Sequence, residues 1–307
     1  MPDAAGPPVA GPRRVLVFGL GHAGRMLAAR LQVAGIACVG TVRDPARAPP
    51  PCGAVLRRFD GNQADAALMA DIAASDAVVA SIPADADGDP ACRRFADVLA
   101  ASRVARIVYL SSTGVYGDRG GGRIDETAAA DACHPAALAR LAAEAQWRAL
   151  GERAGIPVAV LRLPGLYGAG RNALVQLARG HARHIVRPGL AFSRLHVEDL
   201  AEALFAALHL PQPAAFAVQL LADDEAAPPQ DVLAFAAVLS GLPLPPAQDW
   251  RDPVLPESLR RFYQADRRID DAATRALLGW SPRHRSYREG LRALWAAGEG
   301  RPAEVPV

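Results

Sequence analysis

Several features that would narrow the function of this chain are absent from its sequence. Cysteine is scarce, and none of the four residues belongs to a C-x-x-C pair: Cys38, Cys52, Cys92 and Cys133. Because these spacings match neither a metal-binding nor a disulfide framework, we expect reduced thiols. No apolar stretch approaches the roughly 20 residues that a membrane helix requires, which argues against a membrane protein.

Lysine is also absent, and the charge is close to balanced. The chain carries 34 basic residues, all arginine, against 32 acidic residues, for a net charge of +2. Nucleic-acid-binding proteins usually gather their basic residues on one face, so this balance does not favour nucleic acid as a partner. His181 and His184 are spaced like metal ligands but have no further ligands beside them, and we expect no metal site.

The two ends of the sequence contain few of the residue patterns that predict helices or strands. Residues 1–12 are rich in Pro, Gly and Ala and lack the basic-then-apolar order of a signal peptide. We therefore expect a cytoplasmic protein with disordered tails at residues 1–12 and 298–307.

Between these ends, short apolar runs alternate with segments of helical spacing. The apolar runs predict buried strands at residues 14–18, 36–42, 54–59, 77–82, 106–111 and 158–163. Helical spacing is found at residues 25–33, 90–102 and 136–154. This alternation predicts an α/β fold, a doubly wound parallel sheet of the Rossmann type with helices on both faces.

After about residue 164 the pattern changes to proline clusters and short helices. We expect residues 13–165 to form a dinucleotide-binding domain, to which the segment at about 195–220 returns. Residues 166–194 and 221–297 would then form a smaller C-terminal lobe that binds the substrate.

A glycine-rich turn follows the first predicted strand. Gly19, Gly21 and Gly24 have the G-x-G-x-x-G spacing, with His22 and Ala23 between the last two. The first glycine permits a tight turn, the second lets a pyrophosphate approach the backbone, and the third lets helix and strand pack closely. The N-terminus of the next helix would bind the phosphates. A glycine turn without a ligand is the alternative.

The end of the second predicted strand bears on the choice between NAD and NADP. NAD-binding proteins usually place an acidic residue there for the ribose 2′-hydroxyl, and Val42 occupies that position. Arg43 follows, and its guanidinium can bind a 2′-phosphate. We therefore favour NADP over NAD; the alternative is that Arg43 is solvated and Asp44 reaches the ribose.

Five motifs occur in an order typical of one family. They are Y-L-S-S-T-G-V-Y-G at 109–117, D-E at 125–126, L-R-L-P-G-L-Y-G-A-G-R at 161–171, R-L-H-V-E-D-L-A at 194–201, and L-L-G-W-S-P at 277–282 with Y-R-E-G-L at 287–291. Together they resemble the extended short-chain dehydrogenases, the NAD-dependent epimerase/dehydratase family. The resemblance spans residues 13 to about 295.

The resemblance implies a site at the carboxyl ends of the strands. Ser112 would donate to an oxyanion beside the nicotinamide, although it could instead cap the loop after its strand. The other catalytic candidates are Tyr116 and Arg140. Cofactor contacts beyond the glycine turn are expected from Arg43, Ser81, Ile82, Pro83, Ser111, Arg140, Leu163, Pro164 and Gly165. Substrate contacts are expected from Thr113, Tyr167, Asn172 and Arg194.

Two residues of the H-V-E-D motif are expected to serve the fold. His196 is interpreted as structural, and Asp199 as the N-cap of the helix that follows. Arg194 precedes them, and the alternative to its binding a substrate phosphate or carboxylate is that it is a surface residue.

The sequence departs from the family at its catalytic pair, a Tyr-x-x-x-Lys on the helix after the D-E segment. The matching positions hold Ala136 and Arg140. Alanine transfers no proton, and arginine stays charged, so that it can bind ribose but not act as a base. The chain thus resembles an atypical subgroup, in which the phenol of Tyr116 or Tyr167 would have to replace the missing tyrosine.

Two functions are compatible with these features. The first is an NAD(P)-dependent oxidoreductase or epimerase/dehydratase-like enzyme that acts on a small or nucleotide-linked carbonyl or alcohol, with a homodimer as the candidate assembly. The second is a non-catalytic NADP(H)-binding sensor or regulator, which needs no proton donor. The motif residues that face the expected cleft favour the enzyme.

Overall fold

A computed structural model of the chain describes residues 11–49 and 52–301. Its centre is a seven-stranded sheet in the order β11-β7-β5-β4-β1-β2-β3, and every neighbouring pair is parallel. The strands are β1 (Arg14–Phe18), β2 (Ala37–Val42), β3 (Ala54–Arg58), β4 (Ala77–Ala80), β5 (Ile107–Ser112), β7 (Val158–Leu163) and β11 (Phe216–Leu220). The predicted doubly wound parallel sheet is confirmed.

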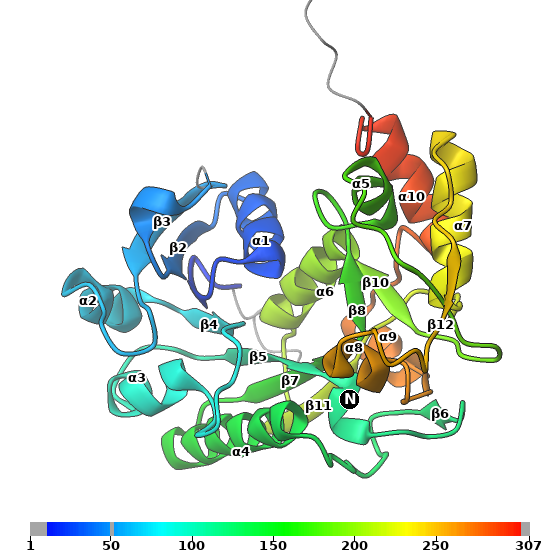
Figure 1. Cartoon of the computed structure of the whole chain (residues 1–307). Coiled ribbons are helices and arrows are strands. Elements are labelled where there is room, and N and C mark those ends of the chain that lie inside the picture. The colour runs from blue at the N-terminus through cyan, green and yellow to red at the C-terminus, as the bar shows by residue number, and fades with distance from the viewer. Residues whose placement is uncertain (1–10, 50–51, 302–307) are drawn as a thin grey trace, which may run out of the picture.

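Helices cover both faces of this sheet (Figure 1). They are α1 (His22–Val33), α2 (Ala67–Ala74), α3 (Pro90–Ala100), α4 (Pro135–Ala154) and α6 (Val197–His209). Successive strand residues point to opposite faces, and β1 shows this clearly. Val15 and Val17 pack with α1 and α6, whereas Leu16 and Phe18 pack with α2, α3 and α4. The apolar runs are continuous because both faces of the sheet are buried.

A second group of elements lies beside the carboxyl ends of the strands (Figure 1). Its helices are α5 (Ala173–Ala178), α7 (Pro229–Ser240), α8 (Glu257–Phe262), α9 (Ala272–Leu278) and α10 (Tyr287–Ala296). Its two-stranded ladders pair β8 (Gly165–Tyr167) with β10 (Arg194–His196), β9 (His184–Val186) with β12 (Ala247–Asp249), and β6 (Arg123–Ile124) with β13 (Arg268–Ile269). Its core is formed mainly by α5, α7 and α10.

The link between the two groups is made by segments distant in sequence. Helix α6 and strand β11 lie with the large sheet, and Leu278 and Trp280 join the apolar cluster between the sheet and α6. Two short 3₁₀ helices, η1 (Pro45–Arg47) and η2 (Thr113–Tyr116), follow β2 and β5. Both begin directly beyond the carboxyl end of a strand, where the candidate site residues gather.

Parts of the two predicted tails are structured. Residues 1–10 and 302–307 lie outside the described residues. A side chain at Gly11 would meet His209, and one at Gly300 would meet Leu174, so both glycines pack against the folded body. Glu299 also accepts a hydrogen bond from Gly170 N at 2.8 Å. The expectation of a disordered tail is therefore wrong for residues 11–12 and 298–301, because tertiary contacts secure them.

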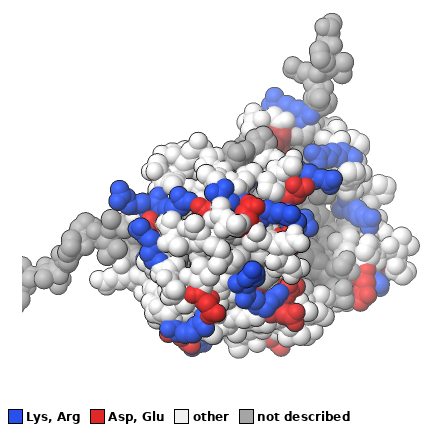
Figure 2. Space-filling model, turned by 90° about the vertical axis from the view of Figure 1, so that its left-hand side faces the viewer, with Lys and Arg blue, Asp and Glu red and all other residues white. Residues whose placement is uncertain are grey.

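The surface mixes charges of both signs. Figure 2 shows basic and acidic side chains interspersed on the face that carries α2 and β3. Several of these arginines pair with carboxylates, such as Arg57 with Asp71 at 2.6 Å and Arg58 with Asp60 at 3.0 Å. Among the described residues, no helix combines the length and the apolar character needed to cross a membrane.

Candidate functional site

The glycine turn lies at the carboxyl end of β1, and two of its three glycines are required sterically. Gly19 has a φ of +92°, which favours glycine, and an added Cβ would lie 2.9 Å from Ser81 Oγ. A Cβ on Gly24 would lie 2.6 Å from Gly19 O, whereas a Cβ on Gly21 would meet nothing within 4 Å. Thr41 Oγ1 and Ser81 Oγ hold the turn, at 2.9 Å from Gly19 N and 2.6 Å from Gly19 O.

The space above Gly21 fits a pyrophosphate. Helix α1 begins there without a side-chain cap, so the backbone N–H groups of its first turn point to an open region at the positive end of the helix. His22 is half-buried beside this turn, and its Nε2 has no hydrogen-bond partner. Burial, and secondarily the charge of Arg171, lowers the pKa of His22. The residues present therefore fit the dinucleotide that the fold implies.

Arg43 and Asp44 differ in their availability to a ribose. Asp44 caps η1, where its Oδ1 accepts a hydrogen bond from Ala46 N at 3.0 Å, and it forms an ion pair with Arg47 at 3.6 Å. Arg43 is exposed and makes no hydrogen bond or ion pair within the described part of the chain. Of the two side chains, Arg43 is therefore the one free to bind a phosphate.

A cavity of about 1040 Å³ lies between the carboxyl ends of β5 and β7 and the smaller group of elements. It is large enough for a small-molecule ligand. Residues from the strand ends, from the start of α4 and from the segments 192–194 and 262–269 line it. The predicted site residues among them are Ser112, Thr113, Arg140, Leu163, Pro164, Gly165 and Arg194.

The catalytic candidates Ser112 and Arg140 lie on the sheet side of this cavity. Ser112 ends β5, and its Oγ accepts a hydrogen bond from Gly114 N at 3.1 Å. This bond makes Ser112 the cap of η2 and leaves its own proton free to donate. Arg140 donates to Leu110 O at 2.7 Å, which attaches α4 to the carboxyl end of β5.

Ser111 and Tyr116 face away from the cavity. Ser111 Oγ donates to Glu144 at 2.5 Å, and Arg162 forms a buried ion pair with the same carboxylate at 2.7 Å. Tyr116 is fully buried, with the Arg162 guanidinium 4.8 Å from its ring centre, and its hydroxyl donates to Asp125 O. Burial raises the pKa of Tyr116. Its phenol therefore cannot exchange protons with a ligand in the cavity, which corrects the expectation of a catalytic Tyr116.

Tyr167 and Asn172 also lie outside the lining of the cavity. Tyr167 packs against Gly290 in the core of the smaller group, and its hydroxyl donates to Ser286 O at 3.3 Å. Asn172 is 5% exposed and caps α5, accepting a hydrogen bond from Val175 N at 3.0 Å. The expectation that these two residues contact the substrate is not supported, because the fold uses both polar groups internally.

The cavity has a cationic wall. Arg194 donates to Phe192 O at 2.9 Å and to Ala227 O at 2.7 Å, and Arg267 donates to Gly117 O at 2.7 Å. With Arg140 they give three arginines, and Asp118 is the carboxylate among the described lining residues. Arg267 escaped the sequence analysis because its segment carries no motif. Such a wall favours an anionic ligand.

His134 is a second lining residue that the motifs did not single out. It precedes the Pro135 that begins α4, and it lies in the cavity lining together with Ala136 and Arg140. Its Nδ1 accepts a hydrogen bond from Ala136 N at 3.2 Å. The signal was available in the sequence, since a histidine directly before the proline that begins a helix occupies the N-cap position, where a capping side chain is expected.

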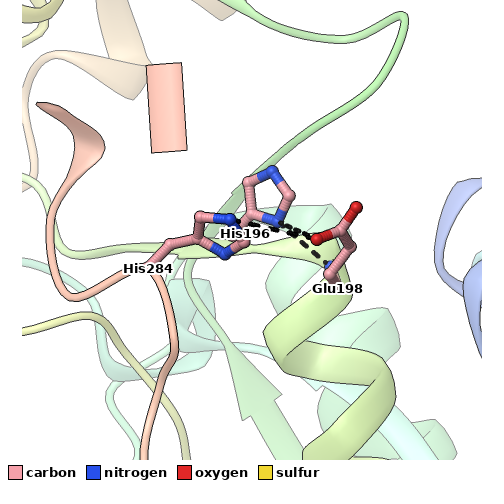
Figure 3. A group of neighbouring side chains, drawn as sticks. All are labelled: His196, Glu198 and His284. Carbon is pink, nitrogen blue, oxygen red and sulfur yellow. Dashed lines mark hydrogen bonds and ion pairs between the residues drawn. The ribbon is translucent and has the colours of Figure 1, made fainter. Parts of the chain in front are cut away.

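His196, Glu198 and His284 meet at the start of α6 (Figure 3). Their ligand atoms lie within 4.8 Å of one another, but His196 Nδ1 already accepts a hydrogen bond from Glu198 N at 3.3 Å. The two imidazole rings are 4.0 Å apart. Burial lowers the pKa of His196 to about 4, so the ring stays neutral. The group ties the start of α6 to the loop before α10.

Asp199 belongs to the same junction but is not the N-cap of α6. The helix begins at Val197, and His196 is its N-cap. The Asp199 carboxylate instead accepts hydrogen bonds from the backbone N–H groups of Arg283 and His284, at 2.7 Å and 3.1 Å. The expected capping role is therefore wrong, because the helix starts two residues earlier and the carboxylate faces a distant loop.

A smaller hollow of about 480 Å³ lies next to the cavity and shares Ser193 and Ile269 with it. Asp223 lines this hollow and is buried, with no hydrogen-bond partner at its Oδ2. Burial raises the pKa of Asp223 to about 8, although the charge of Arg194 acts in the opposite direction. The Asp223 carboxyl is therefore uncharged at neutral pH, and it lies in the hollow next to the arginines of the cavity.

A parallel sheet with its glycine turn and a ligand-sized cavity at one edge defines a dinucleotide-binding protein of the Rossmann type. The model of the NAD dependent epimerase/dehydratase family matches residues 15–218. The chain belongs to this family, which confirms the resemblance seen in the sequence. No curated protein matches the chain.

Solved structures share the fold over most of its length. A functionally unknown conserved protein from Silicibacter pomeroyi DSS is 36% identical, with a TM-score of 0.84, and the match covers 94% of this chain and 100% of that one. MoeE5 in complex with UDP-glucuronic acid and NAD is 23% identical, with a TM-score of 0.76 and coverages of 91% and 96%. UDP-glucuronic acid 4-epimerase from Bacillus cereus, in complex with NAD, is 18% identical, with a TM-score of 0.73 and coverages of 91% and 94%.

Proposed function

We propose that the protein is an NADP(H)-dependent oxidoreductase or epimerase-like enzyme that acts on an anionic carbonyl or alcohol substrate. The observation that carries this proposal is the cavity at the end of β5, whose lining includes Ser112 and three arginines. Its volume of about 1040 Å³ is large enough for a substrate beside the nicotinamide. The bound nicotinamide would supply the hydride chemistry.

The cofactor would lie along the carboxyl ends of the strands. Gly19, Gly21 and Gly24 leave the backbone N–H groups of α1 open to a pyrophosphate, and Arg43 would bind the 2′-phosphate of NADP. Arg140 would approach the ribose, as arginine can replace the lysine of the family pair in binding though not in proton transfer. NAD, the cofactor named with MoeE5 and the Bacillus cereus epimerase, is the alternative.

The substrate would occupy the cavity with its anionic group toward Arg194 and Arg267. Ser112 would donate its free proton as a hydrogen bond to the reacting oxygen, where negative charge develops when the carbonyl carbon accepts a hydride. Nucleotide-linked sugars are suitable candidates because they combine phosphates with an oxidisable alcohol, and MoeE5 was solved with UDP-glucuronic acid and with UDP-glucose.

A second function is favoured by Ala136 and Arg140, which replace the family's catalytic pair. In this alternative the protein is a non-catalytic NADP(H)-binding sensor. The cavity would then receive a regulatory anion, and the side chains along it would contribute to affinity without supporting turnover.

One experiment separates the two functions. Wild type, Ser112→Ala, Ser112→Thr and the double variant Ala136→Tyr/Arg140→Lys are assayed by nicotinamide absorbance at 340 nm over one panel of anionic and nucleotide-linked carbonyls and alcohols. For an enzyme, Ser112→Ala lowers turnover by about 10²–10³-fold, while Ser112→Thr retains much of it because the hydroxyl remains.

The sensor gives a different pattern. Wild type then shows no turnover on the panel, Ser112→Ala changes cofactor affinity only slightly, and the double variant can gain weak reductase activity. Wild-type turnover that survives Ser112→Ala unchanged would show that the reacting oxygen lies elsewhere. Unfolding temperatures of all four proteins control for damage to η2, which Ser112 caps.

A further inference from the structure

The cavity lacks a tyrosine whose phenol could act as the proton donor in this class of reaction. The other polar groups in its lining limit which residue could take that place. No tyrosine belongs to the part of the lining that the structure describes. Arginine does not give up its proton near neutral pH. Asp118 is held as a carboxylate, since the backbone N–H of Asp266 donates to it at 2.7 Å and lowers its pKa. His134 remains as a lining residue with a ring N–H.

The position of His134 places it close to where the phenol would have been. It lies two residues before Ala136 as the N-cap of α4, and the N-terminal part of this helix is attached to the end of β5 by a hydrogen bond from Arg140 to Leu110 O at 2.7 Å. Ala136 is exposed to the cavity and carries only a methyl group, so no bulky side chain at this position fills the space beside the imidazole.

The helix start determines which nitrogen carries the proton. His134 Nδ1 accepts the hydrogen bond from Ala136 N, so Nδ1 must present a lone pair. A neutral imidazole then has its hydrogen on Nε2, the nitrogen on the far side of the ring from the helix. The N-cap thus holds a neutral N–H donor at the edge of the cavity, and His134 is half-buried and able to reach a ligand.

We infer that His134 is a second catalytic donor, which places its Nε2–H on the reacting oxygen together with the Ser112 hydroxyl. The inference rests on the proposed function. A neutral imidazole that polarises a carbonyl from a helix N-terminus is an established catalytic device. The histidine here replaces the hydrogen bond of the missing tyrosine and leaves proton transfer to solvent.

The step balances without a further reagent. In the reduction, a bound reduced nicotinamide would supply the hydride with both its electrons to the carbonyl carbon, and the π electrons of the C=O bond would move to the oxygen. The oxygen, held by Nε2–H and by Ser112, then takes its proton from a water molecule, and the hydroxide is neutralised by the buffer. His134 keeps its proton throughout.

The test compares two substitutions of His134 that differ in whether the new side chain can act as the N-cap of α4. Serine is a good N-cap but too short to reach a ligand in the cavity, whereas alanine supplies neither function. His134→Ser should lower kcat by about 10²–10³-fold and leave the unfolding temperature and the NADPH affinity unchanged. His134→Ala should lose the same activity and also unfold at a lower temperature. Full activity in His134→Ser would overturn the inference and leave the proposed function standing.

A second measurement does not depend on turnover. Long-range ¹H–¹⁵N NMR of histidine-labelled protein at pH 7 should show His134 as the neutral Nε2–H tautomer, and His134→Ser assigns the signal. An Nδ1–H tautomer or an imidazolium would overturn the inference even in an active enzyme. Wild type without turnover on the panel would overturn the proposed function, and the donor role with it.

Discussion

The glycine turn and the start of α4 lie at the carboxyl ends of β1 and β5, two strands separated by β4, and they depend on different properties of the chain. At the turn, Gly19 has a φ of +92°, and a Cβ on Gly24 would meet Gly19 O at 2.6 Å. At the start of α4, Ala136 and Arg140 line the cavity, and the helix begins at Pro135 under a capped N-terminus.

This contrast has a steric cause. At Gly19 and Gly24 a side chain would be strained or would meet the backbone, so these two positions tolerate few changes. A helix face that borders a cavity tolerates more changes, because its side chains project into open space. The fold therefore constrains the glycine turn, whereas the residues that line the cavity are free to set the chemistry.

The first prediction breaks the turn in two ways. Gly24→Ala should unfold more easily, by about 1–3 kcal/mol, because its Cβ would also lie 3.1 Å from Val17 Cγ1 and the backbone must shift. NADPH binding should be lost with it. Thermal unfolding and calorimetric titration measure the two effects.

Gly21→Ala is the matched control within the same turn. Its Cβ meets nothing within 4 Å, so the unfolding temperature should stay near that of wild type. NADPH affinity should nevertheless fall by about tenfold or more, because the methyl group projects where a pyrophosphate would approach. Wild-type affinity in Gly21→Ala would contradict the assignment of this turn to the cofactor.

The second prediction concerns the cavity end and the carboxyl group of Asp223. Its pKa is raised by burial to about 8 from an ordinary value of 3.8, so between these pH values the native state holds a proton that the unfolded state has lost. Stability should therefore fall as pH rises through this window, by roughly 2–3 kcal/mol between pH 5 and pH 7 from this group.

Asp223→Asn removes this titration, and its free energy of unfolding should vary less with pH than that of wild type. Asp224→Asn is the control, since hydrogen bonds from Arg275 and Arg285 lower the pKa of that carboxyl, although partial desolvation acts in the opposite direction. The stability that the Asp224 carboxylate contributes is lost as the pH falls, in the opposite direction to the effect of Asp223. Denaturant unfolding at several pH values measures both, and parallel curves for wild type and Asp223→Asn would refute the raised pKa.

The third prediction concerns the choice between NADP and NAD at the nucleotide end of the site. Arg43→Ala should weaken NADPH binding by about 1–3 kcal/mol and leave NADH binding nearly unchanged, because only NADPH carries the 2′-phosphate. Arg47→Ala serves as the control, since Arg47 is an exposed arginine of the same segment that pairs with Asp44. Equal losses for both cofactors, or a native preference for NADH, would overturn the assignment.

Much of the fold was predictable because its signals are local. The run from Val15 to Phe18 is apolar throughout, and its neighbouring glycines mark the end of the strand, so the strand, turn and helix follow from contiguous residues. The predicted limits of the other strands also agree closely with the structure, since parallel strands buried on both faces have no polar positions to obscure the pattern.

The candidate site was less predictable, because its side chains are chosen by contacts between distant segments. Tyr116 and Tyr167 suit proton transfer as residue types, but Arg162 covers one ring and Ser286 accepts a hydrogen bond from the other hydroxyl. Arg267 reaches the cavity from a segment 150 residues after its partner Gly117. No spacing in the sequence reveals such contacts.

The sequence by itself determined the parallel sheet and the glycine turn, because each depends on residue type and short-range order. Only the tertiary structure decided which polar groups face the cavity. Ser112 and His134 lie in its lining, whereas Tyr116 and Asn172 are buried beside it. The physical reason is that a side chain's direction depends on the packing of elements that are remote in sequence, and packing is settled only when the whole chain has folded.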